Sequence, residues 1–209
     1  MATHVLTNPR WHKSEDGHGP RFRGLALGEV ATVSSGMGEE PLLREEALQT
    51  FRVGDIVYLN AAGNVAIVTE STDTVDSAIL GQAAKPGANA AAAGTPAYVQ
   101  VWRPEDRFLM QVFHTTLSLA VTAQTQMSEV FPIIKDEAGN DTYHIDLVTT
   151  AESPTVTLAR VMVVGFPEGD YINNVKSTLG DTYGWVIVKP LEFSLETTGD
   201  QALQRILQG

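Results

Sequence analysis

Short apolar runs separated by turn residues fill the chain between residues 51 and 113. The first two runs flank residues 60–64, whose sequence Asn-Ala-Ala-Gly-Asn is typical of a turn. Short runs bounded in this way indicate strands of a small β-barrel or sandwich. The pattern therefore predicts a hairpin with a five-residue loop and three further strands. The predicted strands cover residues 51–59, 65–68, 78–83, 97–102 and 107–113.

A second set of β-type runs follows between residues 114 and 193. It combines apolar runs with segments in which β-branched residues alternate with polar ones. The clearest runs are residues 130–134, 142–148, 155–165 and 184–188. Residues 200–208 differ, because their leucines and isoleucine follow helical spacing after Asp200, which is suited to cap a helix. They predict a short C-terminal helix.

The first 24 residues show neither period, and proline and glycine interrupt them repeatedly. Up to residue 23 they hold four basic and two acidic residues, a balance of +2, whereas ten basic and 23 acidic residues follow, a balance of −13. A basic segment ahead of an acidic body is suited to dock on an acidic surface, and aromatic and arginine side chains are common interface anchors. We therefore expect an extended arm that binds a partner, with a disordered terminus as the alternative. The expected contacts are Arg10, Trp11, Arg21, Phe22 and Arg23.

These patterns together predict a mainly β protein with three parts. Residues 1–24 form the extended N-terminal arm, and residues 25–113 form a small β-barrel or sandwich module. Residues 114–209 form a second β-rich unit that ends in the short helix.

Composition excludes several classes of partner. The net charge of −11 opposes association with nucleic acid, whose phosphates would repel the chain. The chain has no cysteine, so it has neither disulfides nor thiolate metal sites. No apolar run reaches the roughly 18 residues of a membrane span. We expect a protein made in the cytoplasm that binds neither nucleic acid nor a membrane.

No stretch of the sequence matches a catalytic, cofactor or metal motif. The spacing of His4, His12 and His18 is too wide for helical zinc ligands, and the acidic turn at 136–141 lacks the spacing of a calcium loop. His144 and Asp146 share one face of a predicted strand, where a surface polar pair is the favoured interpretation. The sequence therefore predicts no catalytic residue, no cofactor and no metal, and a protein that is not an enzyme.

Two stretches resemble structural proteins of tailed-phage heads. The first comprises residues 51–57 (Phe-Arg-Val-Gly-Asp-Ile-Val), Ile79-Leu80-Gly81 and Val99-Gln100-Val101 and resembles the small β-barrel of capsid decoration, or cement, proteins. The second runs from Arg160 to Phe166 and from Gly180 to Val188. It is similar to the ending of small structural proteins encoded beside major capsid genes. The resemblance covers about two-thirds of the chain and leaves out residues 1–24.

The resemblance implies a virion protein without enzymatic activity, assembled in the host cytoplasm. Such proteins bind the outer surface of the capsid, often as homotrimers, and stabilise it by bridging major capsid protein subunits. A tail or fibre β-domain of a virion is one alternative. A carbohydrate-binding or hydrolytic β-sandwich is another, and Trp102, Tyr183 and Trp185 would then be its candidate aromatic platform.

Overall fold

The computed structural model describes residues 4, 6–15, 17, 21–23, 43–60, 62–68, 79–103, 105–136, 141–147, 160–167 and 177–191. This part of the chain forms two β-sheets and two short 3-10 helices, η2 (Leu117–Leu119) and η3 (Gln124–Gln126). The predicted mainly β class is confirmed. The C-terminal helix predicted at 200–208 lies outside the described residues.

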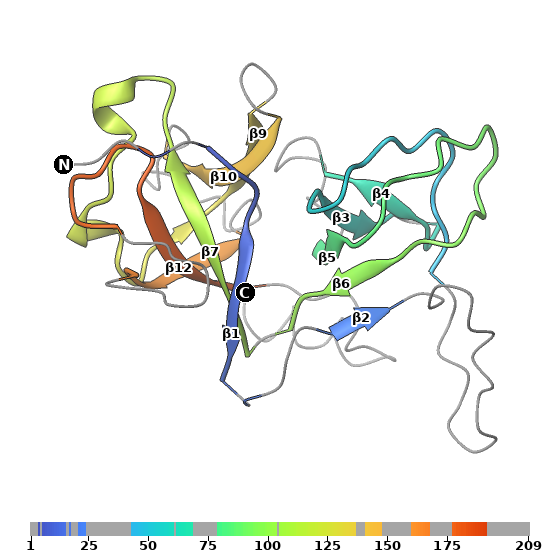
Figure 1. The fold of residues 1–209 in the computed structure, drawn as a ribbon, viewed down its shortest axis with the longest axis horizontal. Helices are drawn as coiled ribbons and strands as arrows, with labels where there is room; N and C mark the ends of the chain where they lie inside the picture. The colour runs from blue at the N-terminus through green and yellow to red at the C-terminus, as the bar shows by residue number, and fades with distance from the viewer. Residues whose placement is uncertain are drawn as a thin grey trace.

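The larger sheet has seven strands and curls into a nearly closed barrel (Figure 1). Six strands follow the order β8-β11-β12-β7-β10-β9, and β1 pairs with β7 beside this path. The two ends of the path, β8 and β9, are separated in sequence by Pro132 alone, so the sheet has to bend back on itself. The strands are β1 (Arg10–Ser14), β7 (Asp106–Phe113), β8 (Val130–Phe131), β9 (Ile133–Asp136), β10 (Thr142–Asp146), β11 (Val161–Gly165) and β12 (Trp185–Pro190).

The second sheet has five strands in the order β2-β6-β5-β3-β4. They are β2 (Arg21–Arg23), β3 (Ile56–Leu59), β4 (Val65–Ile67), β5 (Ile79–Ala83) and β6 (Val99–Val101). The predicted hairpin is confirmed, because β3 and β4 are antiparallel neighbours. Asn60 closes the loop: its amide donates to the Asn64 carbonyl at 2.9 Å, and its side-chain oxygen accepts from the Ala62 and Asn64 amides.

Strand β7 belongs to the barrel, although the sequence pattern placed it with the first module. It pairs with β12 along one edge, and β1 and β10 share its other edge. The chain leaves the five-stranded sheet just before β7, at a tight turn in which the Asp106 amide donates to the Arg103 carbonyl at 3.0 Å. The Arg103 guanidinium also donates to the Asp106 carboxylate at 2.7 Å inside this buried turn. The sheets therefore divide near residues 103–105 rather than at 113.

The glycine of the Ile79-Leu80-Gly81 motif is required by a close approach between strands. Gly81 sits beside an irregularity in the β3–β5 register, with φ at +156°. A Cβ atom there would lie 2.0 Å from the carbonyl oxygen of Gln100 on β6. Any side chain would therefore force β5 and β6 apart.

The two sheets share one hydrophobic core. Inside the barrel, β7 contributes Phe108, Met110 and Val112. The five-stranded sheet and its flanking residues contribute Ile56, Val68, Ile79 and Trp102 to the same cluster. The Trp102 and Phe108 rings lie 4.6 Å apart between centroids. A smaller cluster that includes Phe51, Val57 and Leu80 fills the other side of the five-stranded sheet.

Candidate interaction surface

The N-terminal segment spans both sheets. β1 pairs with β7 of the barrel, and β2 pairs with β6 of the five-stranded sheet (Figure 1). Two residues ahead of β1 fasten it further, because the Asn8 side-chain oxygen accepts from the Tyr143 amide at 3.1 Å and the Pro9 carbonyl accepts from Gln82 at 3.0 Å. Within the described residues, the segment expected to be an arm is therefore built into the body of the protein.

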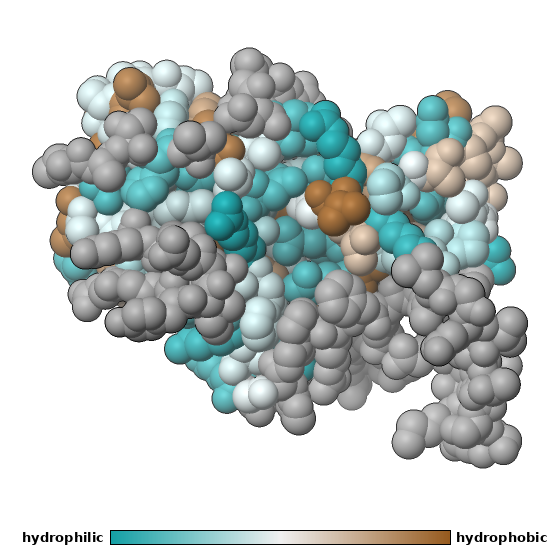
Figure 2. All heavy atoms as spheres, viewed as in Figure 1, coloured by the Kyte–Doolittle hydropathy of each residue, from teal (hydrophilic) through white to brown (hydrophobic). Residues whose placement is uncertain are grey.

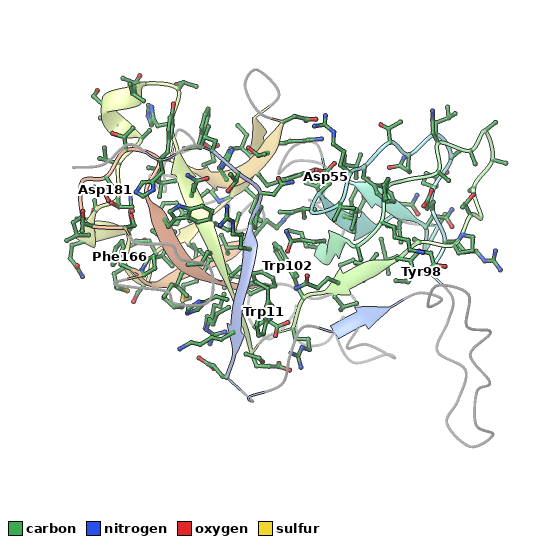
Figure 3. The ribbon with its side chains drawn as sticks, in the orientation of Figure 1. Trp11, Asp55, Tyr98, Trp102, Phe166 and Asp181 are labelled. Carbon is green, nitrogen blue, oxygen red and sulfur yellow. The ribbon has the colours of Figure 1, made fainter. Side chains whose placement is uncertain are left out.

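Arg10 and Trp11 lie on opposite faces of β1. Arg10 is paired in register with Leu109, and its guanidinium carbon lies 5.1 Å from the ring centroid of Trp185. Trp11 is paired with Phe108 and packs against the main core (Figure 3). Both side chains are half-buried against their own chain, so each already stabilises the fold.

Arg21, Phe22 and Arg23 form β2 at one edge of the five-stranded sheet. The structure thus places the five predicted contact residues on two different sheets. Partner binding by these residues stays a prediction.

A small cavity of about 230 Å³ lies where the N-terminal segment crosses the five-stranded sheet. Pro9, Trp11, Gly54 and Gln82 contribute to its lining. The buried Gln82 amide nitrogen donates to the carbonyls of Pro9 and Gly54, at 3.0 and 3.1 Å. The Gln82 side chain thus helps to hold the segment to the sheet.

The aspartate of the Gly54-Asp55 motif joins the two sheets electrostatically. Asp55 is buried, accepts from the Arg52 amide at 2.9 Å, and lies 3.7 Å from the Lys135 ammonium on β9. Lys135 also pairs with Asp141 at 2.9 Å, and Asp141 pairs with the Arg52 guanidinium. Two cations and two anions thus form a neutral cluster across the boundary between the sheets.

The histidine and aspartate of β10 are buried, which corrects the expectation of a surface pair. His144 is fully buried and stacks on Phe113 with 5.7 Å between centroids, and Thr142 lies 2.8 Å from its Nε2. Asp146 is 5% exposed. The interior residues of this strand, Tyr143 and Ile145, point into the barrel, so His144 and Asp146 lie on the covered outer face.

The remaining candidates for a carbohydrate or metal site are either packed within the fold or lack the arrangement that such a site needs. Trp102 and Trp185 are 2% and 4% exposed, so neither offers a free stacking face to a sugar. His4 lies 3.4 Å from the buried carboxylate of Asp181. The described residues contain no group of three or more histidine and acidic side chains arranged to hold a metal ion.

One feature that the sequence pattern did not single out lies at the end of the barrel where β7 finishes. Residues 114–128 contain no charged side chain, although 14 basic and 25 acidic residues occur in the whole chain. The loop that includes η2 is joined to the loop before β12, since the Tyr183 amide donates to the Ala120 carbonyl at 2.8 Å and the Gly180 amide to the Thr122 carbonyl at 2.7 Å.

Exposed side chains of these two loops include three leucines and four hydroxyl residues, all of them uncharged. They are Thr115, Thr116, Leu117, Ser118, Leu119, Thr178 and Leu179. Figure 2 shows the surface around η2, at the upper left, as pale and brown with little of the teal seen elsewhere. The absence of charge over a run of exposed residues was the sequence signal for this surface.

Comparison of the chain with models of protein families, with curated proteins and with solved structures finds no match. Among the residues that the structure describes, none belongs to a helix of the length and apolar character needed to cross a membrane.

Proposed function

We propose that this chain is a structural protein of a tailed-phage virion, which binds the outer surface of the capsid and stabilises it by bridging major capsid protein subunits. The main support is that the motifs behind the resemblance form contiguous pieces of the fold. Strands β3, β5 and β6 pair side by side, and each contains part or all of one motif of the first set. Strands β11 and β12 contain most of the second set and also pair directly. Motifs distant in sequence thus meet in space, as expected for a shared architecture.

A bridging protein has to transmit force without its own parts separating, and the connections between the two sheets meet this need. The sheets share a core at Trp102 and Phe108. The buried Tyr143 hydroxyl of the barrel donates to the Val68 carbonyl beside β4. The Asp55–Lys135 contact adds an electrostatic link. A stiff body is suited to hold two neighbouring subunits at a constant distance.

The proposed partner is the major capsid protein, and the protein acts as a homo-oligomer, with the trimer of the resembling family as the expected state. Several subunits attached together dissociate far more slowly than one, because each release is followed by rebinding at high effective concentration. Modest affinity per contact is then sufficient. The role needs neither a cofactor nor a catalytic residue.

Addition of the purified full chain to capsid shells that lack it tests the proposal. The shells should bind it saturably on their outer surface and should disrupt at a higher temperature than bare shells, as measured by light scattering during heating. Shells that bind none, at protein concentrations that saturate a positive-control decoration protein on its own shells, would overturn the proposal. Selective binding to tails would favour the tail or fibre alternative instead.

The predicted contacts of β2 can be tested in the same assay. Arg21→Glu with Arg23→Glu reverses two charges, and we expect lower occupancy on the shells. The matched control is Lys85→Glu with Lys189→Glu, which changes the net charge by the same amount at two positions outside β2. Equal occupancy for both double variants would show that β2 does not contact the shell. It would not contradict the capsid role, which is tested by the binding of the unmodified chain.

A further inference from the structure

The cavity beside the N-terminal segment has the size of a small-molecule site. Three pieces of chain enclose its volume of about 230 Å³: the N-terminal segment, the residues just before β3, and the five-stranded sheet. Val53, which contributes to the lining, is 59% exposed, so the cavity is accessible from solvent. A cavity of about 150 Å³ is sufficient for benzene, so this one has room for a six-membered ring with substituents.

Two glutamine side chains line the cavity from the sheet. Gln82 on β5 and Gln100 on β6 are directly opposite each other in the strand register, so they lie on the same face of the sheet. The Gln82 amide nitrogen donates to the carbonyls of Pro9 and Gly54, which uses both of its hydrogens. Its side-chain oxygen is therefore the group that can bond a guest, as an acceptor.

The Gln100 amide nitrogen supplies the complementary ability. This nitrogen is buried, and the described part of the chain provides no hydrogen-bond acceptor for it. A buried donor without an acceptor destabilises a fold, and such a group in a native protein requires an explanation, for example a bound molecule. The cavity thus offers a guest an acceptor on Gln82 and a donor on Gln100.

The remaining lining indicates the other properties of the guest. It is mostly carbon and comprises Pro9, Trp11, Val53, Ala83 and Ala84, besides Gly54. None of the described residues that line the cavity is charged, so a charged guest would lose its hydration without gaining an opposite charge. Hydroxyl groups both donate and accept, so a guest with several of them can pair with both glutamines. A neutral six-membered ring that combines hydroxyls with apolar C–H faces is a pyranose sugar.

We propose that this cavity binds one neutral pyranose unit of a saccharide. The Gln82 oxygen accepts from one sugar hydroxyl, the Gln100 amide donates to the oxygen of another, and the carbon-rich lining packs against a face of the ring. The proposal goes beyond the capsid role and does not depend on it, because the whole cavity belongs to a single chain. Recognition of one sugar through few hydrogen bonds is weak, so we expect a dissociation constant of about 1–10 mM.

Nuclear magnetic resonance of the nitrogen-15-labelled full chain tests the proposal. Methyl glucoside, methyl galactoside and N-acetylglucosamine are added separately, each to about 50 mM, which exceeds the expected dissociation constant. At least one of them should shift the side-chain signals of Trp11, Gln82 and Gln100 saturably. The indole signal of Trp185, which does not line the cavity, should stay in place. Glucuronic acid, a similar ring that carries a carboxylate, should bind at least about tenfold more weakly.

Substitutions separate the cavity from the rest of the protein. Gln100→Glu keeps the shape of the side chain, removes the donor and adds a negative charge, so the affinity for the sugar should fall about tenfold or more. The matched control is Gln124→Glu, which makes the same change at an exposed position of η3 and should leave the affinity unchanged. Circular dichroism and urea midpoints show whether each variant is folded. If Gln100→Glu is unfolded, Val53→Trp replaces it, because a larger side chain at this exposed position occupies the cavity without altering either glutamine.

The proposal fails on any of three results. The first is that none of the three neutral sugars shifts the cavity signals, in which case the cavity holds ordered water only. The second is a folded cavity variant that binds the sugar as tightly as Gln124→Glu does. The third is glucuronic acid bound as tightly as the neutral sugars, because the cavity would then not select for neutrality. None of these results bears on the capsid role, which is tested by the binding of the chain to shells.

Discussion

Replacement of Gly81 by alanine should destabilise the protein severely. The added Cβ would lie 2.0 Å from the Gln100 carbonyl oxygen, and the obstacle is backbone, which no side-chain rotation relieves. The β5–β6 pairing extends over three residue pairs, so separation of the strands endangers two or three backbone hydrogen bonds. At about 1 kcal/mol for each bond, with about 1–3 kcal/mol for overpacking as an independent guide, the expected loss is about 2–4 kcal/mol.

Urea denaturation followed by tryptophan fluorescence measures this loss. With an m-value of about 2 kcal/mol/M, the midpoint should fall by about 1–2 M. Gly165→Ala is the matched control, because its Cβ would meet only the Ile187 side chain at 3.5 Å, an ordinary contact. Its midpoint should change little. If both variants unfold at the same urea concentration, the close approach of β5 and β6 is not what demands glycine at position 81.

Three further predictions concern the connections within the body. Tyr143→Phe removes the hydroxyl that donates to the Val68 carbonyl and should cost about 1–3 kcal/mol in urea denaturation, and an unchanged midpoint would contradict the link. Lys135→Met leaves buried Asp55 without its cation and should lower the free energy of unfolding by about 3 kcal/mol. The additional change Asp55→Asn should restore most of this loss in a double-mutant cycle, whereas additive losses would contradict the pairing. The Ala47 amide, followed by the Asn64 and Asn60 side chains, holds the pKa of Glu46 below its ordinary value of 4.5. The carboxylate therefore stabilises the fold above that pH and loses this contribution as the pH falls through its folded-state pKa. Glu46→Gln should reduce stability at pH 7, and the stability of the variant should fall less steeply as the pH is lowered. Thermal denaturation from pH 7 to pH 3 measures both effects.

Local patterns in the sequence predicted the elements whose cause is local. The hairpin around Asn60 and Asn64 follows from turn residues between two apolar runs, and the strands at 79–83 and 99–101 follow from apolar and β-branched runs. These features depend on neighbours within a few residues, which the sequence displays directly.

Features that depend on distant partners could not be read in this way. β7 has the same apolar character whichever sheet it joins, and only its pairing with β12 and β1 assigns it to the barrel. His144 alternates with buried residues as a surface side chain would, but the outer face of β10 is covered. For the N-terminal residues, composition suggested an arm, whereas the pairing of Trp11 with Phe108 is a contact between residues 97 positions apart, which no local period encodes.

For the candidate interaction surface too, the composition was visible in the sequence, but the arrangement in space was not. The basic and aromatic residues of the first 24 positions were visible as a composition bias, and their division between β1 and β2 was not. The neutral run at 114–128 was present in the sequence. The structure added that Leu117 and Leu119 in this run are exposed, as is Leu179 on the loop before β12.

The proposed role on the capsid is tested most directly by electron cryomicroscopy of shells saturated with the purified chain. The account predicts density on the outer surface that accommodates the two-sheet body and touches at least two neighbouring capsid subunits. Bare shells after saturation, or density confined to the tail or to the inner surface, would contradict it.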